Sequence, residues 1–163
     1  MVGSNTGTIS KGKQLVKIKP KYNWTSVFNA LECAEYNKTG RRIDSGVNCF
    51  SMIVNYLDLT GHDVSYENEL INGYTYENIV DRWQENDQAA VEMARELLKN
   101  SVIKIEIGEM KIGDILVARD RTGKMFPCVY TGNGKVFTMT AKGSGRIKLA
   151  LYEIVEVYRG SNL

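Results

Sequence analysis

Cys49 lies at the predicted start of an apolar helix, in the run Gly46-Val47-Asn48-Cys49-Phe50. A thiol becomes a nucleophile when a neighbouring base or a positive potential deprotonates it, and a helix N-terminus supplies such a potential. The base is missing from this pattern, because the chain has one histidine and no histidine follows in the C-terminal half. The residues therefore indicate thiol chemistry without an evident general base.

The one histidine, His62, follows the predicted helix in the run Thr60-Gly61-His62-Asp63. A helix that begins at Cys49 separates the two side chains by about 15 Å at a rise of about 1.5 Å per residue. We therefore predict that His62 is a surface loop residue. Two interpretations of Cys49 stay open, a working nucleophile and a small buried apolar residue, and the second is favoured because free cysteines are often buried.

The remaining cysteines, Cys33 and Cys128, are also predicted to serve packing. Three cysteines and one histidine show neither the spacing of a zinc site nor an even disulfide framework. We therefore expect no metal and no cofactor.

Helical spacing of apolar residues dominates the first part of the folded chain. One helix is predicted to be capped by Thr25 or Ser26 and to end before residues 37–40. A second is predicted over residues 48–59, with Gly61 placed to end it. A third, acidic on its polar face, is predicted over residues 76–98.

From Val102 onward the pattern changes to the alternation typical of strands. Strands are predicted around Ile103, Ile105 and Ile107 and over residues 114–118, 127–131, 135–140 and 149–158. The predicted turns are Arg121-Thr122-Gly123, Asn133-Gly134 and Gly143-Ser144-Gly145. Helices followed by strands predict an α+β domain in which N-terminal helices pack on an antiparallel sheet of about five strands.

The chain of 163 residues has the size and composition of one globular domain, which we place at residues 23–163. Residues 1–22 form a basic arm, because no acidic residue precedes Glu32. The arm is expected to dock on other protein chains, and nucleic acid is the weaker alternative. Its expected partner-binding residues are Lys11, Lys13, Leu15, Val16, Lys17, Ile18 and Lys19.

No apolar stretch has the length of a signal peptide core or of a membrane span. We therefore expect a protein made in the cytoplasm and outside any membrane.

Several short runs in this order resemble the NlpC/P60 family of papain-like cysteine peptidases. They are Gly46-Val47-Asn48-Cys49, Lys111-Ile112-Gly113-Asp114-Ile115 and Val129-Tyr130-Thr131-Gly132-Asn133-Gly134. In that family an Asp-Cys-Ser-Gly run opens the nucleophile helix, a Pro-Gly-Asp-Leu run opens the sheet, and a strand beginning with histidine brings the base. The resemblance covers roughly residues 26–158 and implies the papain-like α+β fold.

The resemblance places Cys49 at the nucleophile position and Tyr36 at the position that helps to stabilise the oxyanion. It places Phe126 at the position of the histidine and Thr138 near the position of the polar residue that orients the histidine. Phe126 cannot accept a proton. The run after the cysteine also differs, because Phe50 puts a bulky ring where the family has a small residue.

These departures imply a degenerate domain that has lost peptidase activity. We expect a structural or docking component of a larger assembly, such as the tail or baseplate of a tailed-phage virion. The alternative is an active peptidase or amidase that acts on cell-wall peptides through Cys49 with a base other than histidine. Lys124, Thr138 and Thr140 are the candidates that the sequence offers for that base.

Overall fold

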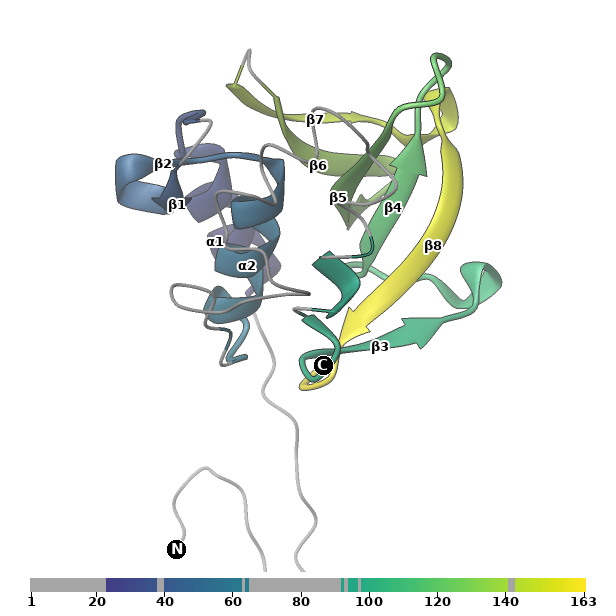
Figure 1. The fold of residues 1–163 in the computed structure, drawn as a ribbon, viewed down its shortest axis with the longest axis horizontal. Coiled ribbons are helices and arrows are strands. Elements are labelled where there is room, and N and C mark those ends of the chain that lie inside the picture. Colours follow the sequence, from purple (N-terminus) through teal and green to yellow (C-terminus); the bar gives the residue numbers. More distant parts are fainter. Residues whose placement is uncertain are drawn as a thin grey trace, which may run out of the picture.

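A computed structural model provides the structure, and it describes residues 23–37, 40–62, 64, 92, 94–96, 98–140 and 143–163. Figure 1 shows the helices α1 (Trp24–Glu32) and α2 (Cys49–Leu59) on one side of a curved antiparallel sheet. The predicted α+β arrangement, with helices first and an antiparallel sheet second, is confirmed. The basic arm and most of the third predicted helix lie outside the described residues.

Helix α1 begins after Asn23, whose side chain accepts a hydrogen bond from the Ser26 backbone N–H at 3.2 Å. The predicted cap at Thr25 or Ser26 is therefore wrong, because asparagine caps helices at least as well as serine or threonine and stands earlier in the chain. Val27, Phe28 and Leu31 are buried on one face of α1, as their spacing predicts.

Helix α2 begins and ends where the sequence predicts. Asn48 is its N-cap, and Thr60 is its C-cap, followed by Gly61 at a φ of 83°. Seven of the 11 residues of this helix are buried, including Met52 and Tyr56 at 0% exposure, whereas Asp58 and Leu59 near its C-terminus are exposed. It is therefore the central helix of the domain and is more buried than an ordinary surface helix.

Of the third predicted helix, residues 92, 94–96 and 98 are described, and all are helical. No helix among the described residues has both the length and the apolar composition needed to cross a membrane.

The main sheet has six strands in the order β3-β8-β4-β5-β6-β7, all antiparallel to their neighbours. A separate small sheet joins β1 and β2. The strand bounds are β1 Arg41–Arg42, β2 Gly46–Val47, β3 Val102–Ile105, β4 Ile115–Arg119, β5 Met125–Gly132, β6 Lys135–Thr140, β7 Gly143–Lys148 and β8 Glu153–Gly160.

The prediction of about five strands missed β7. Its glycines, Gly143 and Gly145, were predicted to form a turn, but the structure pairs them with Thr140 and Thr138 of β6. Strand β7 is an edge strand, where glycine is tolerated because only one side of the backbone is paired. The turn at Asn133-Gly134 is confirmed, since both residues have positive φ and directly join β5 to β6.

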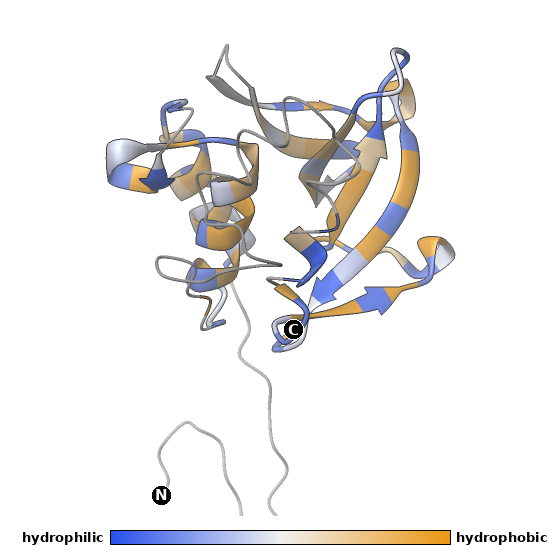
Figure 2. Ribbon diagram, viewed as in Figure 1, coloured by the Kyte–Doolittle hydropathy of each residue, from blue (hydrophilic) through white to orange (hydrophobic). Residues whose placement is uncertain are grey.

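The two faces of the sheet carry different apolar clusters. The face toward the helices includes Ile115, Val117, Met125, Val129, Phe137 and Met139. The opposite face includes Leu116, Ala118, Cys128, Val136 and Val157, with Phe126 and Tyr152 packed against them. Figure 2 shows hydrophobic stretches separated by hydrophilic residues along β8. Which face a strand residue occupies therefore decides whether it can reach α2.

Candidate functional site

Cys49 is the first residue of α2 and carries a half-buried thiol that forms no disulfide. Its side chain packs with a small cluster on the helix-facing side of the sheet, formed by Val117 and Met125 together with Val155 and Tyr158. The predicted position at the N-terminus of a central helix is therefore confirmed. The described hydrophobic neighbours of the thiol are therefore three apolar side chains and one tyrosine.

The first turn of α2 is held by a reciprocal capping arrangement. The Asn48 side-chain oxygen accepts hydrogen bonds from the backbone N–H groups of Phe50 and Ser51, each at 2.9 Å. The Ser51 hydroxyl accepts from the Asn48 N–H at 2.9 Å and donates to the Gly40 carbonyl at 2.8 Å. The backbone N–H groups of Phe50 and Ser51 therefore donate to the Asn48 side chain and are not available to stabilise a developing oxyanion.

Phe50 does not stand over the thiol. Its ring is 3% exposed and belongs to the main core. The bulky residue after the cysteine therefore fills the interior instead of the space in front of Cys49.

Tyr36 lies close to the start of α2 through its backbone. It forms a parallel bridge with Val47, and the flanking hydrogen bonds run from Val47 N–H to Glu35 O at 2.8 Å and from Asn37 N–H to Val47 O at 2.9 Å. Its side chain is 36% exposed. The structure thus brings the backbone of Tyr36 beside the segment that leads into Cys49.

Phe126 and Thr138 are not brought together with Cys49. Phe126 belongs to the cluster on the opposite face of the sheet, where its ring meets that of Tyr152 edge-on at 5.1 Å. The Thr138 hydroxyl is buried and donates to the Pro127 carbonyl at 3.3 Å. The strand that the resemblance assigns to the base therefore faces Cys49 with Met125 and not with Phe126.

His62 is buried at 7% exposure, so the predicted surface loop position is wrong. Its Nε2 accepts a hydrogen bond from the Asn162 N–H at 2.9 Å, and its Nδ1 lies 3.2 Å from the Leu57 carbonyl. The ring also packs against Gly160, where an added Cβ would lie 2.5 Å from Cε1. Asn162 lies 100 residues after His62 in the chain, and Gly160 belongs to the same C-terminal segment. The local sequence around His62 therefore gives no sign of these two contacts.

The hydrogen bonds of His62 fix the neutral ring, because an Nε2 that accepts from an N–H carries no proton. Burial lowers the pKa of His62, and the bond to the Leu57 carbonyl opposes this in part. In the unfolded chain the imidazole titrates near pH 6.5. Below that pH the unfolded state takes up the proton first, so the folded state loses stability as pH falls toward its lower pKa.

We expect the free energy of unfolding to decrease between pH 7.5 and pH 5 with a histidine contribution of up to about 1.4 kcal/mol per pH unit. The measurement is urea denaturation at several pH values. In the variant His62→Gln this contribution should be missing, so that its curve is flatter across the same range. Parallel curves for the two proteins would contradict the assignment to His62.

A polar cluster that the sequence did not predict lies near Tyr158. Arg95 Nε donates to Glu156 Oε1 at 2.9 Å and to the Tyr158 hydroxyl at 3.1 Å, and that hydroxyl donates to the same carboxylate at 3.0 Å. Burial alone would raise the pKa of Glu156, but the hydrogen bonds from Arg95 and Tyr158 outweigh it and lower the pKa. Arg95 is remote from β8 in sequence, so no local pattern could have indicated this cluster.

The other two thiols lie apart from the thiol of Cys49. Cys128 is buried in the cluster on the opposite sheet face, and burial raises the pKa of its thiol. Cys33 is exposed at the end of α1. Within the described residues, no group of three or more His, Cys, Asp or Glu side chains is placed to hold a metal ion.

The fold and the position of Cys49 define an α+β domain with a thiol at the start of a central helix. No protein-family model matches the sequence, and no curated protein matches it. Among solved structures, the chain is similar to the crystal structure of the NlpC/p60 domain of the peptidoglycan hydrolase SagA, with 17% identity and a TM-score of 0.49. The similarity covers 83% of this chain and 97% of that one.

Proposed function

We propose that the chain is a non-catalytic domain of the NlpC/P60-like type that serves as a structural or docking component of a larger assembly, such as a phage tail or baseplate. The position of His62 carries this proposal. Helix α2 has 11 residues, with Cys49 at its start and His62 beyond its end. The helix alone therefore separates the thiol from the one imidazole of the chain by about 15 Å.

The consequence for catalysis is large. A histidine deprotonates a hydrolytic thiol and then protonates the leaving group, and general acid–base catalysis of this kind contributes about 10²- to 10⁴-fold to the rate. The buried ring of His62 forms hydrogen bonds with the Asn162 N–H and the Leu57 carbonyl. Moving it to Cys49 would require breaking the contacts that hold the end of the chain.

The alternative function is a peptidase or amidase that acts on cell-wall peptides through Cys49. The position of the thiol at the start of α2 favours it, because the helix dipole stabilises a thiolate there. A base other than histidine is then required. Of the residues that the sequence offers, the Thr138 hydroxyl donates to the Pro127 carbonyl, and the Lys124 backbone N–H donates to the Asp120 carboxylate.

Turnover of cell-wall peptide fragments distinguishes the two functions. We expect the purified chain and its Cys49→Ala variant to release no product above the blank, as followed by mass spectrometry. The variant should change the free energy of unfolding by about 1 kcal/mol or less, as is usual for trimming a small side chain. Product release by the chain that disappears in the variant would establish the enzyme and contradict our proposal.

The docking surface that we propose is the basic arm, residues 1–22, on the strength of its charge pattern. A chain without the arm is expected to remain folded and to lose its place in the assembly.

A further inference from the structure

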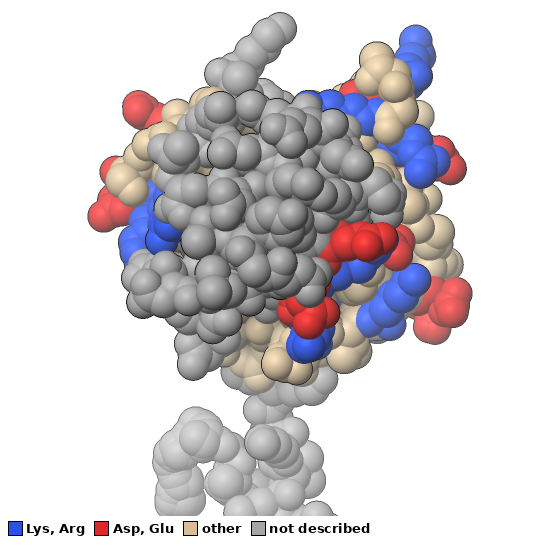
Figure 3. Space-filling model, in the orientation of Figure 1, with Lys and Arg blue, Asp and Glu red and all other residues tan. Residues whose placement is uncertain are grey.

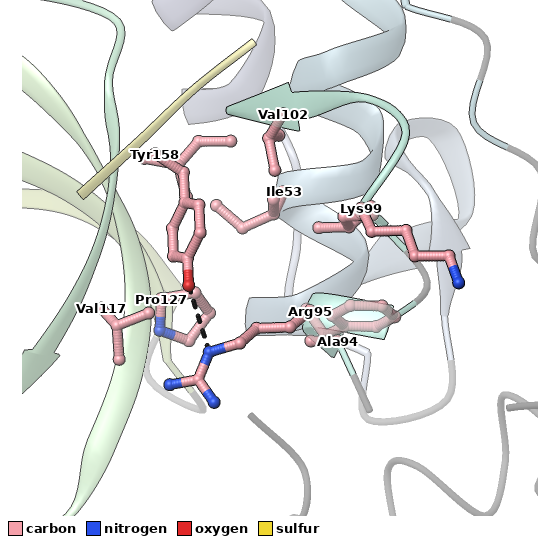
Figure 4. A pocket seen from close by; sticks show the side chains of 11 residues that line it. Ile53, Ala94, Arg95, Lys99, Val102, Val117, Pro127 and Tyr158 are labelled. Atoms are coloured by element: carbon pink, nitrogen blue, oxygen red, sulfur yellow. Dashed lines mark hydrogen bonds between the residues drawn. The ribbon is translucent and has the colours of Figure 1, made fainter. Parts of the chain in front are cut away.

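A cavity of about 260 Å³ lies between α2, the helical residues 94–96 and 98, and the helix-facing side of the sheet. Figure 4 shows Ile53, Val102 and Tyr158 pointing into the same space from three different elements. Most of its walls are apolar, with contributions from Phe50, Ile53, Leu98, Val102, Ile115 and Val117. It is separate from the thiol cluster but adjoins it, because Val117 and Tyr158 belong to both.

The charged side chains among the described residues that line this cavity are both basic. Arg95 and Lys99 line it, and Arg95 is held by Glu156 and Tyr158. Lys104 Nζ forms a salt bridge with Glu156 Oε2 at 3.4 Å, and Lys99 Nζ forms one with Glu96 Oε1 at 2.6 Å. Each of the two lining cations therefore has a carboxylate partner, Glu156 for Arg95 and Glu96 for Lys99, and neither carboxylate is among the described residues that line the cavity. Figure 3 shows that Lys and Arg side chains lie beside Asp and Glu side chains on the visible described surface.

We propose that the cavity binds the alkyl chain of a medium-chain fatty acid, with the carboxylate at Arg95 and Lys99. This site goes beyond the proposed function, because it requires neither catalysis by Cys49 nor the basic arm. A dry apolar cavity of about 150 Å³ holds benzene, so on the same scale 260 Å³ has room for about ten carbons. The apolar walls would bind the chain, and the two lining cations, Arg95 and Lys99, would orient the acid group.

The chain length of the ligand provides the first test. Each buried methylene group is worth about fourfold in affinity. We therefore expect decanoate, which has two more methylene groups, to bind about fifteenfold more tightly than octanoate in isothermal titration calorimetry of the full chain, with a stoichiometry of one. No saturable binding of decanoate at millimolar concentration, or no increase from octanoate to decanoate, would contradict the proposal.

The head group provides the second test. Decanol and decyltrimethylammonium have similar chains without the negative charge, and both are expected to bind at least threefold more weakly than decanoate. Lys99→Gln is expected to weaken decanoate binding about threefold and to leave decanol binding unchanged, since exposed charge pairs contribute little each. The matched control is Lys148→Gln, an exposed lysine in β7 that does not line the cavity. Equal affinity for decanoate and decanol would contradict the assigned head group.

A variant that fills the cavity locates the site. Ala94 lines the cavity and is half-buried, so Ala94→Phe places a ring where the alkyl chain would lie. We expect it to weaken decanoate binding more than tenfold while the cooperative urea transition of the protein is kept. If Ala94→Phe does not fold, Val102→Phe, on another wall of the same cavity, replaces it. Undiminished decanoate binding in a folded variant would place the ligand elsewhere and overturn the proposal.

Discussion

Replacement of Asp114 by alanine is expected to lower the free energy of unfolding by about 3–5 kcal/mol, because it leaves a partly buried guanidinium without its counter-ion. The Asp114 side chain is 1% exposed, and its two oxygens accept hydrogen bonds from Arg159 Nε at 2.8 Å and Nη2 at 2.9 Å. The same carboxylate accepts from the Lys111 backbone N–H at 2.8 Å. It therefore joins the turn before β4 to the neighbouring strand β8.

Urea denaturation measures this cost, and Glu153→Ala is the matched control. Glu153 pairs with Arg119 at 3.1 Å, but both side chains are exposed, at 65% and 39%. Exposed pairs contribute about 0–1 kcal/mol, so the control should unfold nearly as the original protein does. Equal costs for the two variants would mean that the Asp114–Arg159 pair is not the structural link that we describe.

Replacement of Gly113 by alanine is expected to cost about 3 kcal/mol, because a Cβ at this position has no space. The residue has a φ of 92°, and an added Cβ would lie 2.4 Å from Trp24 Cη2 and 2.9 Å from the Tyr56 hydroxyl. That hydroxyl donates to the Gly113 carbonyl at 2.6 Å. Gly113 is therefore the point at which α1 and α2 contact the turn that leads into β4.

The variant Gly123→Ala measures how much backbone strain alone lowers the free energy of unfolding, without the steric overlap that is present at Gly113. Gly123 has a similar φ of 88°, but no atom lies within 4 Å of its added Cβ. Its variant should lose only the backbone part, about 1 kcal/mol. Both variants are measured by urea denaturation. If Gly113→Ala is no less stable than Gly123→Ala, the close packing at Gly113 does not contribute to stability.

Local sequence determined the parts of the fold that depend on neighbours in the chain. The helical spacing of Phe50, Ile53 and Val54 predicted α2, and Asn133-Gly134 predicted the β5–β6 turn, because capping, periodicity and positive φ are properties of short segments. The prediction of a turn at Gly143 and Gly145 was wrong, because both glycines belong to the edge strand β7. The prediction of the first helix cap was also wrong, because several good capping residues follow one another there.

The tertiary structure alone decided what surrounds each candidate site residue. The sequence placed Cys49 at a helix N-terminus, but it could not show that Met125 and Val117 would be its neighbours or that Phe126 would face the other way. Nor could it show that the chain end would bury His62. These contacts join segments that are far apart in the chain. They depend on how strands pair and on which side chains are buried against the sheet, and the periodicity of one segment does not determine either.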